Sequence, residues 1–184
     1  MIVLETPRLI VRDHREGDLE GLTALLTSPD DMRYLSELYA RNAAAARKNL
    51  DASLAEQNNP LRTMFFFAIE EKASGCYVGE VGFTIEQSTQ SGSLADLGYF
   101  MLREFHGKGY MTEAGKRVVE FAFAEAGVHK IKSGCLKENK ASERVMQKLG
   151  FLKEGELRAH QYHEGVWKDR VVYGLLKIDA RPTA

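Results

Sequence analysis

LGYFMLREFHGKGYMTEA, residues 97–114, is the stretch that decides the fold. It begins in a predicted strand over residues 94–102, crosses a polar loop that contains Gly107 and Gly109, and enters a predicted helix over residues 110–126. Glycine has no Cβ atom, so the loop backbone can adopt positive φ angles and a phosphate can approach it closely. The first N–H groups of the helix would be unpaired and partly positive. The stretch therefore predicts an anion-binding site, although plain surface turns use the same pattern.

Two familiar phosphate-binding motifs are absent from the sequence. It contains no GxxxxGK(S/T) segment, which excludes a P-loop, and the pair Gly107 and Gly109 lacks the third glycine of GxGxxG. A nucleoside triphosphatase or a dinucleotide-dependent dehydrogenase is therefore poorly supported. A module that binds ATP on the same glycine loop stays open as a weaker interpretation.

Hydrophobic spacing and turn residues predict the remaining elements. The whole order is strand, helix, helix, strand, strand, strand, helix, strand, helix, strand, strand. Tight turns between successive strands favour antiparallel pairing, and the unit over residues 94–136 predicts a right-handed parallel crossover. The sequence therefore predicts an α+β fold, a mixed α/β sheet with helices over it. The other predicted elements are strands 9–13, 64–70, 76–86, 129–136, 151–159 and 168–176, helix 19–26 capped by Asp18, and helices 42–57 and 139–149.

The composition is that of an ordinary globular chain. Its 184 residues are 44% hydrophobic and 28% charged, which predicts a single domain over residues 1–184 rather than a disordered chain. The longest apolar run, residues 64–69, is too short to cross a bilayer. Charged residues near the start argue against a signal peptide, so a cytoplasmic location is expected.

The charges are balanced overall but not along the chain. Lys and Arg total 25 against 26 Asp and Glu, so no nucleic-acid or membrane partner is expected. Residues 103–148 nevertheless contain ten basic and six acidic residues, which suits one small polyanionic ligand. Cys76 and Cys135 lack the spacing of a metal site or a redox pair, so both are expected to be reduced thiols.

A second informative segment is ENKASERVMQKLGF, residues 138–151. Asn139 lies at a predicted strand–helix junction and is a good N-cap residue, and Ser142 lies one turn further on. The residues alone leave two interpretations open. Asn139 either caps the helix and does nothing more, or faces the same ligand as the glycine loop together with Ser142.

These segments together resemble the GNAT superfamily of acetyl-CoA-dependent N-acetyltransferases, and more narrowly its RimJ/RimL-type branch. The resemblance rests on HGKGYMTEA at 106–114, on residues 138–151, and on LETPRLIVR at 4–12, GELR at 155–158 and WKDRVVYGLLK at 167–177. It implies a central, mostly antiparallel twisted sheet with a splayed parallel pair in the middle and helices on both faces.

The resemblance also implies how the cofactor is held. Backbone amides of residues 106–111 would bind the pyrophosphate of acetyl-CoA, the strand over residues 97–102 would pair with the pantetheine arm, Asn139 would contact the same arm, and Ser142 would lie near the thioester sulfur. The cofactor-binding residues expected on this basis are Phe100, Met101, Leu102, Arg103, His106, Gly107, Lys108, Gly109, Tyr110, Met111, Thr112, Asn139 and Ser142.

The reaction implied is direct attack of a primary amine on acetyl-CoA in a ternary complex, with a protein N-terminal amine as the suggested acceptor. An ammonium must first lose a proton, for which Asp96 and Glu80 are the candidate bases. A backbone N–H near Phe100 or Met101 is the candidate oxyanion donor. The family often has a tyrosine where this chain has Met146, so Ser142 is the candidate proton donor to the leaving thiolate.

Several alternatives stay open. The missing tyrosine allows a non-catalytic acyl-CoA-binding or regulatory module on the same fold, and the acceptor of an active enzyme could equally be a polyamine, an amino acid or an aminoglycoside. A homodimer is also left open. His160, His163 and Glu164 could form a metal site on paper, but a helical i, i+3 pair is not expected beside Gly165 and no further cluster of ligands is evident, so no metal is expected.

Overall fold

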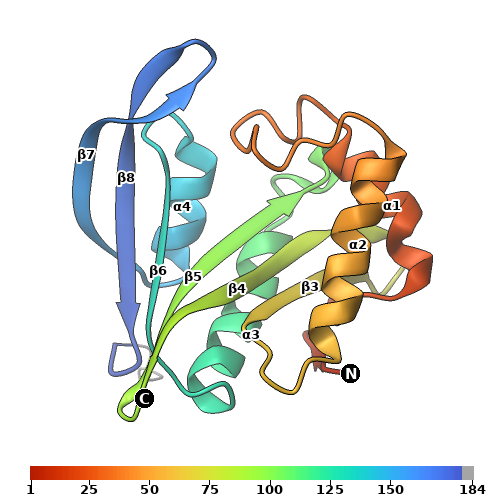
Figure 1. Cartoon of the computed structure of the whole chain (residues 1–184), viewed down its shortest axis with the longest axis horizontal. Helices are drawn as coiled ribbons and strands as arrows, with labels where there is room; N and C mark the ends of the chain where they lie inside the picture. Colours follow the sequence, from red (N-terminus) through yellow and green to blue (C-terminus); the bar gives the residue numbers. More distant parts are fainter. Residues whose placement is uncertain (180–184) are drawn as a thin grey trace. The chain divides into compact units, whose positions relative to one another are not determined.

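The computed structural model describes residues 1–179, which form eight strands and four α-helices (Figure 1). Most of the predicted elements are present, with some changes at their ends. The elements are β1 Val3–Glu5, β2 Leu9–Arg12, α1 Leu19–Leu26, α2 Ala43–Gln57, β3 Met64–Glu71, β4 Tyr77–Thr89, β5 Gly92–Met101, α3 Tyr110–Ala124, β6 Val128–Leu136, α4 Lys140–Lys148, β7 Leu152–His163 and β8 Val166–Leu176, with short 3-10 turns at Glu16–Asp18 and Arg103–Phe105.

The strands form one mixed sheet in the order β1-β2-β3-β4-β5-β6-β8-β7. Ser93–Asp96 of β5 run parallel to Val128–Lys132 of β6, because α3 carries the chain back before β6 begins. The other registers described, β1 with β2, β2 with β3, β3 with β4, β6 with β8 and β7 with β8, are antiparallel. This arrangement confirms the predicted α+β class and its parallel pair.

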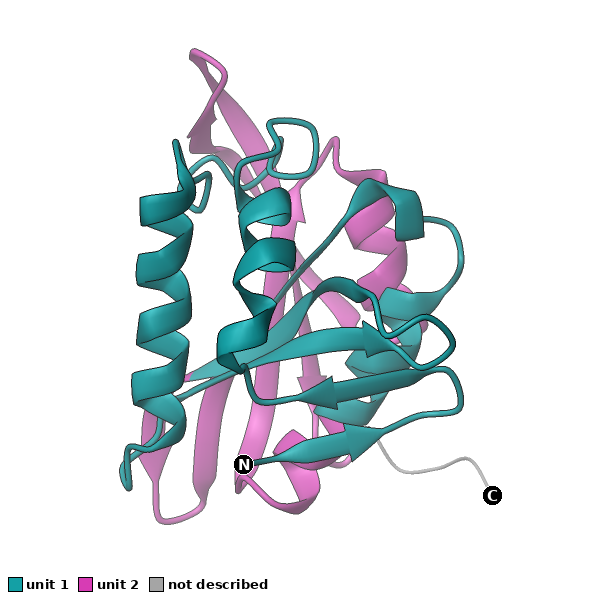
Figure 2. Ribbon diagram, turned by 90° about the vertical axis from the view of Figure 1, so that its right-hand side faces the viewer, with its two compact units in different colours: residues 1–84, 98–118 teal, residues 85–97, 119–184 magenta. Residues whose placement is uncertain are grey.

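The chain forms two compact units, which Figure 2 distinguishes by colour. Unit 1 contains residues 1–84 and 98–118, and unit 2 contains residues 85–97 and 119–184. Strands β4 and β5 and helix α3 therefore contribute residues to both units. The expectation of a single domain stays a prediction.

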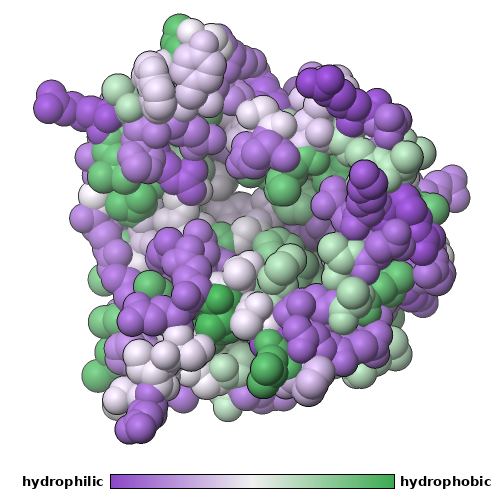
Figure 3. All heavy atoms as spheres, in the orientation of Figure 1, coloured by the Kyte–Doolittle hydropathy of each residue, from purple (hydrophilic) through white to green (hydrophobic). Residues whose placement is uncertain are grey.

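In unit 1, helices α1 and α2 cover one face of the strands and the start of α3 lies on the other (Figure 1). The leucines of α1 recur at helical spacing, and Leu22, Leu25 and Leu26 are all buried together with Leu50 of α2. Helix α2 begins after Asn42, whose side chain accepts the Ala45 N–H at 3.0 Å. Only Ala46 and Leu50 of α2 are buried, and the surface over this helix is largely hydrophilic (Figure 3).

Two details of unit 1 differ from the sequence prediction. Strand β1 was not predicted, because its three residues are too few to show an alternating pattern. Asp18 does not cap α1. Its carboxylate accepts the Arg15 N–H at 2.8 Å, which closes the preceding 3-10 turn, and it pairs with Arg12. The buried guanidinium of Arg12 holds the carboxylate away from the α1 amides.

In unit 2, strands β6, β8 and β7 lie beside α4, whose Met146 is fully buried. The β7–β8 hairpin is longer than predicted, although its turn lies at Glu164 and Gly165 as expected. Three residues of β7, 158–160, lie opposite the single residue Asp169 of β8, so the register between the two strands shifts there. Ala159, in the middle of the three, has a φ angle of 46°. No helix within the described residues is long and apolar enough to span a membrane.

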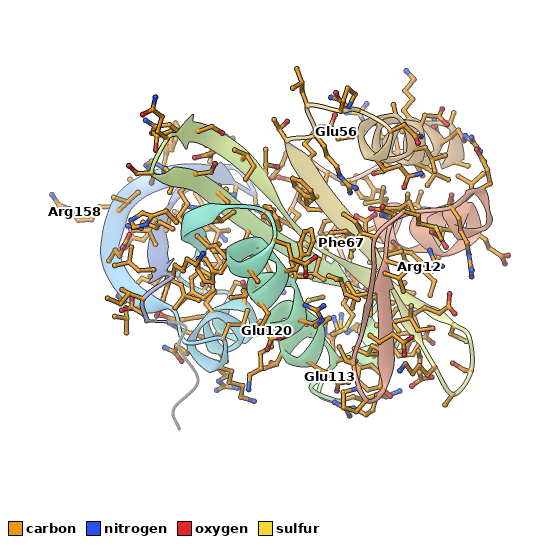
Figure 4. The ribbon with its side chains drawn as sticks, turned by 90° about the horizontal axis from the view of Figure 1, so that it is seen from below. Arg12, Glu56, Phe67, Glu113, Glu120 and Arg158 are labelled. Atoms are coloured by element: carbon orange, nitrogen blue, oxygen red, sulfur yellow. The ribbon has the colours of Figure 1, made fainter. Side chains whose placement is uncertain are left out.

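A buried ionic network joins four segments of unit 1. Arg12 donates from Nη1 and Nη2 to the two oxygens of Asp18, at 2.8 Å each, and from Nη2 to Glu70 at 2.9 Å (Figure 4). His14 Nε2 lies 2.7 Å from Glu80 Oε1, and its Nδ1 lies 3.6 Å from Asp18 Oδ2. Burial favours the neutral imidazole, but hydrogen bonds to Asp18 and Glu80 and their charges outweigh it and raise the pKa of His14 to about 9.

This network predicts a pH-dependent stability. The folded-state pKa of His14 lies above its ordinary value of 6.5, so the protonated ring stabilises the fold below pH 6.5 and this contribution is lost as pH rises through about 9. We expect His14→Gln to lower the free energy of unfolding at pH 6 by up to about 3 kcal/mol, and much less at pH 9.5. Urea unfolding of both proteins across this range measures the difference.

The matched control is His160→Gln, at an exposed histidine of β7. Its effect on the free energy of unfolding should be small and should not follow this pH course. A His14→Gln deficit that stays constant from pH 6 to pH 9.5 would contradict the assignment.

Candidate functional site

The glycine loop of unit 1 is exposed and held at both ends by buried aromatic rings. Phe105 and Tyr110 are buried, and their ring centroids lie 6.3 Å apart. Between them, Gly107 and Gly109 have φ angles of 76° and 79°, in the left-handed region that favours glycine. The two positive angles turn the chain sharply into α3, as the sequence predicted.

The backbone amides of this loop divide into two groups. The Arg103 N–H is taken by Asp31 Oδ1 and the His106 N–H by the Arg103 carbonyl, each at 3.0 Å. The amides of residues 107–112 have no acceptor among residues 1–179, and the first amide of α3 to pair is that of Glu113, which donates to the Gly109 carbonyl at 3.0 Å. We call the amides of residues 107–112 the open amides. They lie where a helix N-terminus carries partial positive charge, so they can bind an anion.

His106 is therefore a correction to the sequence prediction, since its amide is closed. Its ring is committed as well, because Nε2 donates to the Met101 carbonyl at 3.0 Å. Met111 keeps its amide open, but its side chain is buried in the core.

Two cations flank the open amides. The Lys108 ammonium lies 4.8 Å from the centre of the Phe105 ring. Arg103 is largely exposed, and its Nη1 lies 3.4 Å from Asp30 Oδ2. Neither cation is buried, so both add modest, salt-screened attraction to an anion.

The end of β5 is held closely against β4 within unit 1. A Cβ atom on Gly79 of β4 would lie 2.4 Å from the Phe100 carbonyl oxygen, so only glycine fits there. Phe100 packs into the α1–α2 core, and the Leu102 N–H donates to the Val78 carbonyl at 3.0 Å. The backbone of Phe100, Met101 and Leu102 is thereby fixed, whereas the oxyanion donor expected near it stays a prediction.

The two candidate bases have different surroundings. Glu80 is only 6% exposed, and its carboxylate is engaged by His14. Asp96, in unit 2, pairs in register with Lys132, and its carboxylate lies 3.7 Å from the Lys132 ammonium. Burial raises the pKa of Asp96, helped by the nearby charge of Glu86 and opposed by Lys132. Its side chain is 40% exposed, so Asp96 has the accessibility that Glu80 lacks.

Asn139 is the N-cap of α4, as predicted. Its Oδ1 accepts the Ser142 N–H at 3.1 Å, which leaves the Ser142 hydroxyl on the first turn and half-buried. The hydroxyl lies beside the buried thiol of Cys135. Burial raises the pKa of this thiol, and a hydrogen bond with Ser142 partly offsets the shift. The contact between Cys135 and Ser142 could not be predicted from local patterns, because Cys135 is in β6 and Ser142 is in α4.

The β7–β8 hairpin holds a group of potential metal ligands that differs from the one considered on the sequence. The fold brings Glu138 to His163 and Glu164, with ligand atoms within 4.8 Å of one another, and His160 does not belong to this group. The absence of a metal stays a prediction. The Lys168 ammonium lies 2.6 Å from Glu138 Oε1 and 3.5 Å from Glu164 Oε2. A lysine therefore already supplies positive charge to both carboxylates.

The sequence is similar to known acetyltransferases over much of its length. Residues 8–152 match the family model described as acetyltransferase (GNAT) domain. The N-acetyltransferase YoaA of Bacillus subtilis (strain 168) is 29% identical over 177 residues, 95% of this chain and 97% of that protein. The ribosomal protein uS5 alanine N-acetyltransferase of Escherichia coli (strain K12) is 31% identical over 86 residues, 47% of this chain and 44% of that protein.

A solved structure has the same fold. The ribosomal L7/L12 α-N-protein acetyltransferase RimL, in complex with coenzyme A, superposes with a TM-score of 0.80 at 18% identity, over 98% of this chain and 100% of that one. The family resemblance read from the motifs is thus confirmed. Since the family model spans most of its length, the chain belongs to the GNAT family and is an acetyl-CoA-dependent N-acetyltransferase.

Proposed function

We propose that this enzyme acetylates the N-terminal amine of a protein, and that the open amides hold the diphosphate of acetyl-CoA. The observation that carries the cofactor proposal is the row of open amides between two positive-φ glycines at the start of α3. Backbone N–H groups at a helix N-terminus match the oxygens of a diphosphate in charge and hydrogen bonding. The names of the similar proteins support a ribosomal-protein N-terminus as the acceptor.

The chain's own groups then divide the chemistry. Acetyl-CoA, when bound, supplies the activated acetyl thioester. Asp96 takes the proton from the acceptor ammonium, and its raised pKa makes it a stronger base than an ordinary aspartate. The Ser142 hydroxyl would give a proton to the departing sulfur. A backbone N–H near Phe100 or Met101 would donate to the acyl oxygen, and Asn139 would hold the pantetheine arm.

The cofactor site predicts a position-specific effect of valine. Gly109→Val places a β-branched residue at a φ angle of 79° and disturbs the open amides. We expect the Kd for acetyl-CoA, measured by isothermal titration, to rise at least about tenfold. Gly127→Val is the matched control, since Gly127 lies beyond the other end of α3 with a φ angle of 66° and open space around it.

The control should bind acetyl-CoA within about twofold of the wild-type affinity. Absence of acetyl-CoA binding by the wild-type protein would defeat the cofactor proposal itself. Stronger competition by ATP than by coenzyme A would support an ATP-binding module instead.

The catalytic assignments predict two different kinetic defects. Asp96→Asn should lower kcat by about 100-fold and remove the acidic limb of the pH–rate profile, because the neutral amide cannot accept a proton. Ser142→Ala should lower kcat by about tenfold with little change in the KM for acetyl-CoA. Glu80→Gln tests the other base and should reduce stability more than kcat, since Glu80 is buried against His14.

If Asp96→Asn reacts at the normal rate and Glu80→Gln loses activity, the role of general base would be assigned to Glu80 instead. If the wild-type protein binds acetyl-CoA but transfers to no amine, and Ser142→Ala is indistinguishable from it, the chain is a non-catalytic module.

The acceptor proposal predicts a preference among amines. A peptide that begins with a free alanine should gain one acetyl group by mass spectrometry, and the same peptide with a blocked N-terminus should gain none. Spermidine, free amino acids and an aminoglycoside, assayed at equal concentration by thiol release, should react at least about tenfold more slowly in kcat/KM. Faster reaction of any of these small amines would assign the enzyme to that acceptor class.

A further inference from the structure

The motif LETPRLIVR at residues 4–12 carries polar residues that the proposed chemistry does not use. Two of them, Thr6 and Arg8, lie between β1 and β2 and reach across unit 1 to the start of α3. We propose that Thr6 and Arg8 are positioning residues that fix the direction of the open amides. This inference rests on the proposed binding of acetyl-CoA at that loop.

Glu113, in the first turn of α3, is the centre of these contacts (Figure 4). Its Oε1 accepts the Thr6 hydroxyl at 2.7 Å and the Arg8 N–H at 2.9 Å. Its Oε2 accepts Nε of Arg8 at 2.7 Å and pairs with Nη2 at 2.6 Å. The carboxylate is thus bound by both residues, with a backbone and a side-chain contact from Arg8.

Arg8 makes a further contact with the loop itself. Its Nη1 donates to the Lys108 carbonyl at 3.0 Å. In a planar trans peptide the C=O and the following N–H point in opposite directions. A Lys108 carbonyl held toward Arg8 therefore directs the Gly109 N–H away from Arg8. Since Gly109 alone would allow this peptide to rotate, the contact with Arg8 supplies the constraint that glycine lacks.

Arg8 also stacks against the next residue. Its guanidinium lies 4.6 Å from the centre of the Tyr110 ring, and the Tyr110 hydroxyl donates to Glu71. The residue that opens α3 is therefore held on one side by an arginine and at its tip by β3. Together these contacts fix the peptides on either side of Gly109.

The charge of Arg8 has a second effect at this helix end. Burial raises the pKa of Glu113, but hydrogen bonds from Thr6 and Arg8 and the charge of Arg8 outweigh it, so the net shift is downward and Glu113 is ionised at neutral pH. An unpaired carboxylate in the first turn of α3 would repel a diphosphate. Pairing with Arg8 neutralises it.

Most of the hydrogen-bonding capacity of Arg8 is directed at the protein. Glu113 engages Nε and Nη2, and the Lys108 carbonyl accepts from Nη1, which uses three of the five guanidinium N–H groups. The role that we assign to Arg8 is therefore exerted through the loop.

The test compares Arg8→Met and Arg8→Lys with wild-type protein. We expect Arg8→Met to raise the KM and the Kd for acetyl-CoA about tenfold while kcat stays within about twofold. Arg8→Lys keeps the charge, but a single ammonium cannot reproduce the fork that bridges Glu113 and the Lys108 carbonyl, so it should recover only part of the affinity. In the absence of any ligand, hydrogen exchange at His106 and Glu113, whose bonded amides lie on either side of the open amides, should be faster in both variants.

Arg47→Met is the matched control, because Arg47 makes a comparable pair of bonds to Glu16, at 2.6 and 2.9 Å, away from the loop. Its hydrogen exchange at His106 and Glu113 and its affinity for acetyl-CoA should equal those of the wild type. The inference would be overturned if Arg8→Met or Arg8→Lys kept both the acetyl-CoA affinity and the hydrogen exchange of the wild type. If Arg8→Met does not fold, Arg8→Lys alone serves as the test. Failure of wild-type protein to bind acetyl-CoA would instead defeat the proposed function.

Discussion

The first turn of any α-helix contains N–H groups that the helix itself cannot pair, and α3 leaves this requirement unmet at the glycine loop. Phe105 and Tyr110 anchor the loop in the core on either side, while Gly107 and Gly109 give the backbone the positive φ angles that turn it into α3. The side chains that hold the start of α3 bond to one another and not to the open amides. Arg8 and Thr6 bind Glu113, and Glu71 accepts the Tyr110 hydroxyl. The start of the helix is thus held by side chains, while the open amides keep no acceptor among residues 1–179.

The ionic network around Arg12 and His14 places a different demand on unit 1. Burying several charges is costly unless each has partners. Here a guanidinium and an imidazolium face three carboxylates, and the exposed Arg15 supplies the third positive charge through its contact with Glu70 at 2.8 Å. Its hydrogen bonds and ion pairs connect β2, the 3-10 turn before α1, β3 and β4. It also explains why Glu80 is poorly suited to meet a substrate, since removing its charge would leave His14 without its nearest partner.

The sequence predicted most of the fold because its signals are local. Leucine spacing in α1, the Ala run with Leu50 in α2 and the positive-φ glycines each act within a few residues. The differences arise where a residue has a partner that its type does not reveal. Asp18 is a good cap by type, but Arg12 takes its carboxylate. The Arg103 carbonyl closes the His106 amide through a local 3-10 turn, and Glu138 approaches His163 only through the fold. The role of Arg8 was equally hidden, because its partners lie about 100 positions away along the chain.

The register shift in β7 bears on how copies of the chain can associate. As the last strand of the sheet, β7 presents an outer edge that another extended segment could in principle prolong. The three residues opposite Asp169 interrupt that edge, and the Ala159 N–H turns inward to Asp169 Oδ1 at 3.0 Å. An intruding strand would find its hydrogen-bonding ladder broken midway. Pairing of two molecules along β7 is therefore better served by side-chain surfaces than by a continuous intermolecular sheet.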